Sequence, residues 1–393
     1  MDNITYLYNV NHHVYWGILI AIYFFYTGIS AGAFLISSLG NVFGIKKYKM
    51  VEKTGVILSI VFLAIAPLHL IADLQQPAKF WHLLVNIHFT SAMSYGVFLL
   101  LIYFLTCIIY AWFIFREDLA RYLIEKNNWR SKLYSLIILK DKRLDNKTLN
   151  RDAAWKRRLG IFGILLALLL EGYTGFLLAD VQTRALWHNA LMPWIFLMSA
   201  LVSGTGVFIV VLMIVEKSKV GMLVPEVKKV IVDMTQLMKW FIVIDGAMLI
   251  STFITLWYGN QESYAAGYFL LRGDEQVGFI GIELILGLLV PLILMSLPKI
   301  KESNVCIVIS SILAIIGVVA MRINFVIGGQ KIPLTGNKIL QYQIEPSQLT
   351  IVISFAIAAS IILAFFYYLL PMNHNYTPNH GKNKNQIGSQ KGA

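Results

Sequence analysis

Cysteine is almost absent from this chain. Only Cys107 and Cys306 occur among 393 residues, and they form no Cys-x-x-Cys pair. Iron–sulfur clusters and cysteine-bound structural zinc ions need several thiolate ligands arranged around one centre. The sequence therefore excludes a cysteine-bound cluster or zinc site within this chain, and it offers no other metal site.

Charge is also scarce, and long apolar runs take its place. Charged residues make up 14% of the sequence and hydrophobic residues 58%. Soluble domains are usually about 45–50% apolar. This composition predicts an integral membrane protein.

Nine apolar stretches approach or exceed the roughly 20 residues that a membrane-crossing helix needs. They lie at residues 15–43, 54–73, 89–115, 159–180, 191–215, 240–258, 279–297, 304–325 and 349–370. Short alternating segments typical of a membrane barrel do not occur. Ala31–Phe34 resembles Thr205–Phe208, a weak sign of an internal repeat. We expect an all-α polytopic membrane bundle of about nine helices, arranged as two four-helix bundles plus one extra helix.

Basic residues gather in alternate connections between these stretches. If the amino terminus lies outside, 27 of the 33 Lys and Arg residues fall on the cytoplasmic side. Cytoplasmic loops carry this excess in membrane proteins. We expect an outside amino terminus and a cytoplasmic carboxyl terminus in the cell inner membrane. The charge of +12 then indicates membrane lipids rather than nucleic acid as a partner.

The chain divides at its polar segments. We expect helices one to four in residues 1–180, including a basic cytoplasmic loop at 116–158, and helices five to nine in residues 181–371. The tail at 372–393 is rich in Asn, Gly and Lys, a composition typical of disorder.

Ionisable residues inside membrane spans are costly, at about 2.5–3.5 kcal/mol each, and they commonly mark function. The candidates here are His69, Asp73, Glu171, Asp245, Glu283 and Arg322. His69 and Asp73 are four residues apart, so they share a helix face. This pair can pass protons, because the unperturbed pKa of His is near 6.5. The alternative is a polar helix end that meets lipid headgroups.

The densest polar motif is Glu171-Gly172-Tyr173-Thr174-Gly175. Gly172 and Gly175 lie three residues apart and permit close approach of a backbone or a flat ligand. The phenol of Tyr173 can donate a hydrogen bond to a quinone carbonyl while its ring packs on the head-group. The alternative is a helix-packing face whose carboxylate bonds a neighbour.

Two further interpretations concern the second half of the chain. Glu283 and Arg322 are expected at similar depth, so we predict an ion pair, structural in role. Asp245 is expected about one turn from the cytoplasmic end of its span. It serves either as a point where protons enter or as a carboxylate that reaches Lys239, and we favour the second role.

Histidine usage excludes bis-histidine haem. Of eight histidines, only His69 lies clearly within a span, whereas a membrane haem needs axial ligands inside the bundle. Phosphate-binding glycine loops, Ser/His/Asp arrangements and zinc-hydrolase motifs are not found in the sequence either. We therefore expect no catalytic residue of a terminal reaction in this chain.

Several motifs occur in the order seen in one known family. They are Tyr23–Gly32, Asp73–Trp81, Thr90–Gly96, Glu171–Gly175 with Leu186-Trp187, and Arg322 with Gly328-Gly329-Gln330. With them the chain resembles the NrfD/PsrC family, the membrane subunits of polysulfide reductase, nitrite reductase and related complexes.

The resemblance implies a quinone pocket, for menaquinone or ubiquinone, among the first four helices at the non-cytoplasmic face. It also implies an iron–sulfur partner subunit docked at that face and a catalytic subunit that often carries molybdopterin. Tyr173 matches the quinone-contacting tyrosine, and Asp73 lies near the acidic position of helix two. Polysulfide reductase has a histidine in helix one where this chain has Tyr23, and His69 is a candidate substitute. Arg322 and Gln330 match the Arg-to-Gly-Gln ending of longer members.

Together these observations predict a quinone-linked subunit of a respiratory complex used in anaerobic respiration. We expect quinone contacts from Tyr173, His69, Tyr23, Gly172 and Gly175. We expect a proton relay of Asp73, Glu171, Asp245 and Glu283, with proton translocation left open. The alternatives are a proton or ion transporter subunit and a passive membrane anchor.

Overall fold

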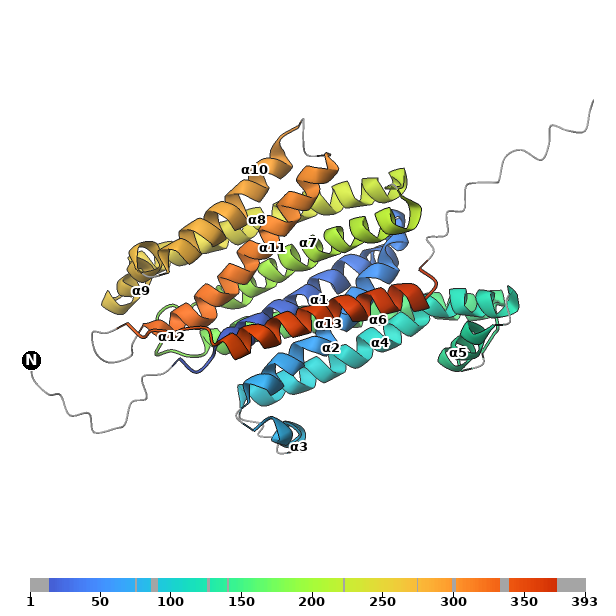
Figure 1. Cartoon of the computed structure of the whole chain (residues 1–393), viewed down its shortest axis with the longest axis horizontal. Coiled ribbons are helices and arrows are strands. Elements are labelled where there is room, and N and C mark those ends of the chain that lie inside the picture. Colours follow the sequence, from blue (N-terminus) through green and yellow to red (C-terminus); the bar gives the residue numbers. More distant parts are fainter. Residues whose placement is uncertain are drawn as a thin grey trace, which may run out of the picture.

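The computed structural model describes residues 14–74, 76–85, 91–125, 128–139, 141–221, 223–273, 275–298, 302–332 and 339–372. Within these ranges, nine helices are long and apolar enough to cross a membrane. The expected helical membrane bundle is therefore confirmed (Figure 1). Most of the tail for which disorder was predicted, residues 373–393, lies outside the described ranges.

The long helices follow the expected order. The membrane-crossing elements are α1 Ile18–Val42, α2 Glu52–Asp73, α4 Ala92–Glu125, α6 Asn146–Ala179, α7 Met192–Val220, α8 Pro225–Trp257, π-helix η3 Val277–Leu289 continued by α10 Val290–Ser296, α11 Asn304–Ile323 continued by π-helix η4 Asn324–Gly328 and α12 Gly329–Lys331, and α13 Pro346–Leu369. The shorter elements are η1 Lys46–Met50, η2 Pro77–Lys79, α3 His82–Val85, α5 Trp129–Ile137 and α9 Gln261–Arg272.

Helix starts follow local sequence signals. Pro225 and Pro346 open the first turns of α8 and α13, where a missing N–H costs nothing. The Asp145 side chain caps α6 by accepting a hydrogen bond from the Thr148 N–H at 3.1 Å. These signals lie in polar connections, so they fix helix ends outside the apolar runs.

The helices pack as two groups around α1. Helices α1, α2, α4 and α6 contact one another on one side, and α7, α8, η3–α10 and α11 do so on the other (Figure 1). Helix α1 also packs on α7 and α11, and it is buried along most of its length. Helix α13 packs mainly on α2. This arrangement matches the expected two four-helix bundles with one extra helix.

The two groups meet where glycines let backbones approach. A Cβ on Gly32 of α1 would lie 2.9 Å from the Gly204 Cα of α7, closer than side-chain atoms come. Gly204 is next to Thr205, the start of the segment that resembles Ala31–Phe34. The similar segments thus lie at the crossing of the first helix of each group, where small residues are needed.

Two boundaries differ from expectation. Helix α8 begins at Pro225, well before the apolar run that starts at Trp240. Its first turns are amphipathic: Val227, Ile231 and Met234 are buried whereas Lys228 is not, so the helix continues beyond the apolar window. The basic loop at 116–158 is likewise mostly helical, since the ends of α4 and α6 and all of α5 fall within it.

The connections between helices define two faces of the bundle. Among the described residues, the first face carries the connections at 76–85, 180–191, 258–273 and 339–345. The second face carries those at 43–51, 128–139, 141–145, 223–224 and 302–303. The described amino-terminal end, before α1, lies at the first face.

Candidate functional site

A fully buried arginine lies between the two helix groups. Arg322 of α11 has no exposed surface, and its Nη2 donates a hydrogen bond to the Phe196 carbonyl oxygen of α7 at 3.1 Å. The guanidinium carbon also stacks 3.8 Å from the centre of the Phe196 ring. Its Nε and Nη1 have no hydrogen-bond partner among the described residues. Buried donors usually have a hydrogen-bond partner. Arg322 is therefore only partly hydrogen-bonded, which is unusual for a buried cation.

The ion-pair partner of Arg322 is Glu171 of α6. The distance from Arg322 Nη2 to Glu171 Oε2 is 3.6 Å, and both side chains are completely buried. Thr27 lies beside the carboxylate, but its hydroxyl donates to the Phe24 carbonyl at 3.0 Å. Neither Glu171 oxygen accepts a hydrogen bond within the described residues. The predicted pair of Arg322 with Glu283 is therefore wrong.

Glu283 has a different partner. The Asn324 side-chain amide donates a hydrogen bond to Glu283 Oε2 at 2.6 Å. Both residues lie in π-helical segments, Glu283 in η3 and Asn324 in η4. Glu283 and Arg322 were expected at equal depth, but two side chains pair only if their helices also turn them toward each other. Here the π-helical turns of η3 and η4 accompany the pairing of Glu283 with Asn324 instead.

Asp245 does not lie near the second face. It is twenty residues into α8 and is 8% exposed. It interacts electrostatically with Arg322 and Glu283, rather than reaching Lys239. The favoured interpretation of Asp245 was wrong because the helix begins earlier than the apolar run. Glu171, Arg322, Asp245 and Glu283 thus form one buried row across both helix groups.

A second cluster adjoins this row within the first helix group. Tyr23 of α1 is buried and interacts electrostatically with both Tyr173 and Glu171. The phenol of Tyr173 packs on the backbone of Gly96 in α4, where any Cβ would collide with it. Tyr23 therefore lies within electrostatic range of Tyr173 and Glu171.

The two glycines of the Glu171–Gly175 motif differ in their surroundings. A Cβ on Gly175 would lie 2.6 Å from the Met192 carbonyl oxygen at the start of α7, so Gly175 serves helix packing. A Cβ on Gly172 would meet no atom within 4 Å. Open space therefore lies beside Gly172, on the side of α6 where Leu169 and Phe176, one turn away in each direction, are exposed.

His69 packs apart from Tyr173. Its ring lies edge-on between Tyr26 of α1, at 4.8 Å, and Phe355 of α13, at 4.9 Å. Its Nδ1 is 3.3 Å from the Ile65 carbonyl oxygen, whereas Nε2 has no partner among the described residues. Asp73 is half-buried at the first-face end of α2 and interacts electrostatically with Tyr342. A shared hydrogen bond of His69 and Asp73 is not formed within the described residues, and their proton role stays a prediction.

Gln330 holds the chain where it enters α1. Its Oε1 accepts hydrogen bonds from the backbone N–H groups of Tyr15 and Trp16, at 2.9 and 3.0 Å. Its Nε2 donates to the carbonyl oxygens of Trp16 and Val326, at 2.9 and 2.8 Å. The amide is fully used, which fits a structural role for Gln330. It does not contact the Arg322 guanidinium.

The larger cavities lie elsewhere. One of about 640 Å³ lies toward the second face and is lined mainly by apolar residues, with Lys47 and Asp233 paired beside it. Another of about 600 Å³ lies at the first face between α9, Arg184 and Gly329. Neither is lined by Tyr23, Tyr173 or His69.

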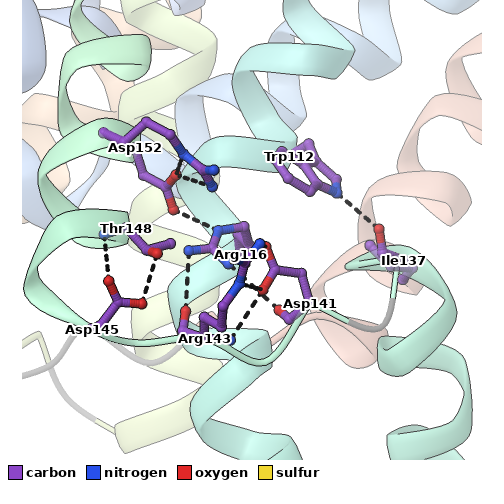
Figure 2. A network of polar contacts seen from close by, with 9 residues as sticks. Trp112, Arg116, Ile137, Asp141, Arg143, Asp145, Thr148 and Asp152 are labelled. Atoms are coloured by element: carbon purple, nitrogen blue, oxygen red, sulfur yellow. Dashed lines mark hydrogen bonds and ion pairs between the residues drawn. The ribbon is translucent and has the colours of Figure 1, made fainter.

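A separate polar network lies at the second face (Figure 2). Arg116 of α4 is fully buried, and its Nε donates to Asp152 Oδ2 of α6 at 2.5 Å. Its Nη2 donates to the Arg143 carbonyl oxygen at 3.3 Å, and its Nη1 pairs with Asp141 at 3.5 Å. Arg143 also donates hydrogen bonds to Asp141, which lowers the pKa of that carboxyl to about 2. This network fixes residues 141–145 against α4 and α6.

The sequence did not single out several residues that shape the site. Phe196 supplies a backbone carbonyl and a ring to Arg322, Asn324 binds Glu283, and Gly96 gives space to Tyr173. Asn324 carries a sequence signal, an amide within an apolar span, and Gly96 ends the motif Thr90–Gly96, although the sequence does not link it to Tyr173. The site therefore contains two phenols, Tyr23 and Tyr173, and the carboxyl group of Glu171. Glu171 also belongs to the buried row, whose carboxyl groups can exchange protons.

Comparison with known proteins gives the same family as the motifs. A family model described as "Polysulphide reductase, NrfD" matches residues 7–333. A selenate reductase subunit of Mesobacillus selenatarsenatis is 29% identical over 319 residues, which cover 78% of this chain and 72% of that protein. The Haemophilus influenzae protein NrfD homolog is 28% identical, covering 80% of this chain and 94% of its own. A polysulfide reductase subunit of Wolinella succinogenes is 26% identical, covering 81% and 95%.

The family match extends over most of the chain and includes eight of the nine long helices described. It also includes every residue of the buried row. This chain belongs to the polysulphide reductase NrfD family of multi-pass membrane proteins.

Proposed function

We propose that this chain is the quinone-binding membrane subunit of a respiratory reductase complex. It exchanges electrons between the membrane quinone pool and an iron–sulfur partner subunit. The observation that carries the proposal is the Tyr23–Tyr173–Glu171 cluster, in which a buried phenol interacts electrostatically with a second phenol and a carboxyl group. The names of the relatives, which include reductase subunits, support it.

The side chains in this cluster fit a quinone head-group. A phenol hydroxyl donates a hydrogen bond to a carbonyl oxygen, and its ring packs on a flat partner. Glu171 has two buried oxygens without a hydrogen bond among the described residues, so it can accept one from a hydroxyl group. Tyr173 and Tyr23 would hold the head-group, and Gly172 would leave room for it. Gly175 places α6 against α7 instead.

The division of chemistry follows from these groups. A bound quinone supplies the two-electron redox chemistry. Tyr173 orients its carbonyl oxygen, and Glu171 holds or releases the proton that accompanies electron transfer. Arg322, 3.6 Å from Glu171, would interact favourably with the carboxylate once its proton has left. His69 as a second ligand of the head-group stays a prediction, because it packs against α13.

The partner subunit would dock at the first face. The basic second-face connections favour a cytoplasmic second face and an external first face in the cell inner membrane. Helix α9 and the 600 Å³ cavity beside it offer a shaped surface there, together with residues 76–85. A catalytic subunit with molybdopterin or another centre would bind beyond it. Anionic lipids would contact the second face.

Quinol-site inhibitor binding to the purified complex tests the proposal. Tyr173→Phe removes one hydroxyl, and Gly172→Leu adds a bulky side chain whose Cβ would meet no atom within 4 Å. We expect at least tenfold weaker inhibitor binding in both variants, measured by fluorescence quenching. Tyr258→Phe is the control, since Tyr258 is 87% exposed. Unchanged binding in both test variants would contradict the proposed site.

Two other functions give different results. A proton or ion transporter subunit is favoured by the buried row, and it would move protons in liposomes without quinol. A passive anchor would tolerate all of these substitutions. Copurification of a partner rich in Cys-x-x-Cys motifs, together with loss of inhibitor binding, would support the quinone-linked subunit over both.

A further inference from the structure

The buried row carries more carboxyl groups than its single cation can balance. Glu171, Asp245 and Glu283 are 0%, 8% and 3% exposed. Among the described residues, Arg322 is the one cation that interacts with them. Ionising all three carboxyls would leave two uncompensated charges in an apolar bundle, which is strongly unfavourable. A neutral row requires that two of the three carboxyls hold a proton.

A small cavity joins two of these carboxyls. It has a volume of about 20 Å³ and is lined by Asp245, Glu283 and apolar or glycine residues. Asp245 Oδ1 and Glu283 Oε1 are buried and have no hydrogen-bond partner among the described residues. One water molecule needs roughly 10–15 Å³ and two to four polar partners. A hard cation needs about six oxygen ligands, whereas the side chains here supply two carboxyls, so water fits and a cation does not.

Local backbone geometry produces this arrangement. Glu283 lies in π-helix η3, and the hydrogen bond from Asn324 of π-helix η4 occupies its Oε2. Its other oxygen is left for the cavity. Gly287 and Gly317 also line the cavity, and their backbones are in contact, so η3 and α11 approach closely there. π-Helical turns inside membrane helices often occur at functional sites.

We propose that Asp245 and Glu283 face one water molecule and each hold a proton while Glu171 is ionised, and that they share a single proton when Glu171 is protonated. When Glu171 gains a proton, an O–H bond forms there and Arg322 loses its counterion. The guanidinium then attracts negative charge at Asp245, whose O–H bond breaks and passes its proton to the water. That proton is released to the solvent, so the net charge of the row is unchanged and one proton remains between Asp245 and Glu283.

The groups that face the row come from every helix packed around it. Helix α1 contributes Tyr23, α6 contributes Glu171, and α11 contributes Arg322. Helix α8 contributes Asp245 and η3 contributes Glu283, whereas α7 contributes the non-titrating Phe196 and Val202. The coupling to Glu171 rests on the proposed function for its proton source. The shared proton of Asp245 and Glu283 does not.

Infrared spectroscopy of the purified complex, without added quinone, tests the shared proton. We expect the carbonyl band of a protonated, buried carboxyl group that shifts slowly in D₂O. It should be lost or displaced in Asp245→Asn and in Glu283→Gln, since each removes one member of the pair. Glu302→Gln, at the exposed second face, is the control and should leave the band unchanged. A band absent from the wild type would overturn the shared proton.

Two further measurements complete the test. Wild-type protein with ¹³C-labelled aspartate identifies the Asp245 contribution without any substitution, so misfolded variants do not leave the proposal open. Glu171→Gln imitates the protonated side chain, and we expect it to diminish the labelled aspartic acid band. An unchanged band would overturn the coupling. Because no quinone is present, failure here is distinct from failure of inhibitor binding.

Discussion

Two arginines are completely buried in the described part of this protein, and they are bound in opposite ways. Arg116, at the second face, directs Nε, Nη1 and Nη2 to Asp152, Asp141 and the Arg143 carbonyl oxygen. Arg322, between the helix groups, has one hydrogen bond and a loose ion pair, and its Nε and Nη1 remain unbound among the described residues.

The difference indicates different roles. A buried charge with all donors satisfied fixes a unique arrangement of the chain, and removing it leaves its partners unpaired. A buried charge with free donors contributes little to stability but responds to any change in nearby protonation. We infer that Arg116 is structural and that Arg322 is functional, and the following substitutions test this contrast.

The largest effect on stability is expected from Arg116→Met. This change leaves Asp152 buried without its strongest partner, a loss of about 3–5 kcal/mol. Thermal unfolding of the detergent-purified protein measures it. Arg121→Met is the control: Arg121 is 57% exposed and pairs with Glu117 one turn away, worth about 0.3–0.5 kcal/mol. Equal shifts of Tm in the two variants would refute a structural role for Arg116.

Arg322→Met should show the reverse pattern. Its carboxyl neighbours can take up protons and remain neutral, so we expect a smaller loss of stability than for Arg116→Met. Quinol-linked turnover of the complex should fall at least tenfold, which is about 1.4 kcal/mol. If Arg322→Met unfolds the protein as strongly as Arg116→Met, the contrast between the two arginines fails.

Neutralising the acidic partners sharpens the comparison. Asp152→Asn weakens a short charge-assisted hydrogen bond, so we expect a loss of about 1.5–3 kcal/mol. Glu171→Gln removes a 3.6 Å ion pair without a hydrogen bond. Because Asp245 can ionise and balance Arg322 in its place, we expect a smaller loss than for Asp152→Asn. Paired denaturation curves for the two variants measure this. A larger loss for Glu171→Gln would indicate that Arg322 is bound more tightly than its geometry implies.

The smallest expected effect is on the pH dependence of the second-face network. The folded pKa of Asp141, about 2, lies below its unfolded value near 3.9. Its ionised form therefore stabilises the protein above about pH 4, and this contribution is lost as pH falls toward 2. Asp141→Asn should flatten stability over that range. An identical pH profile in the variant would mean that the Arg143 hydrogen bond contributes nothing.

The sequence predicted which residues matter better than it predicted their partners. Glu171, Arg322, Asp245 and Glu283 stand out because charge is rare in apolar spans, and all four are buried. Their pairing depends on helix rotation and on π turns, which apolar periodicity does not encode. The depth of Asp245 was wrong because α8 extends through a polar amphipathic segment.

Arg116, in contrast, is a buried residue that the sequence does not distinguish. It begins a segment with thirteen basic residues, so the sequence gives it no distinction from its neighbours. Only the fold buries it while Arg143 and Arg151 stay largely exposed. The Phe196 carbonyl that binds Arg322 is equally hidden, because every residue has a backbone carbonyl. A structural charge within a basic loop is therefore recognised only from its three-dimensional surroundings.

Helix α13 has a consequence for the biogenesis of the protein. It lies outside both four-helix groups, and its Phe355 ring covers His69 of α2. Ribosomes make α13 after every other membrane helix described, so His69 enters the membrane long before its cover exists. Until α13 inserts, this imidazole lacks its contact with Phe355, and burial of the second helix is completed only when α13 packs on it.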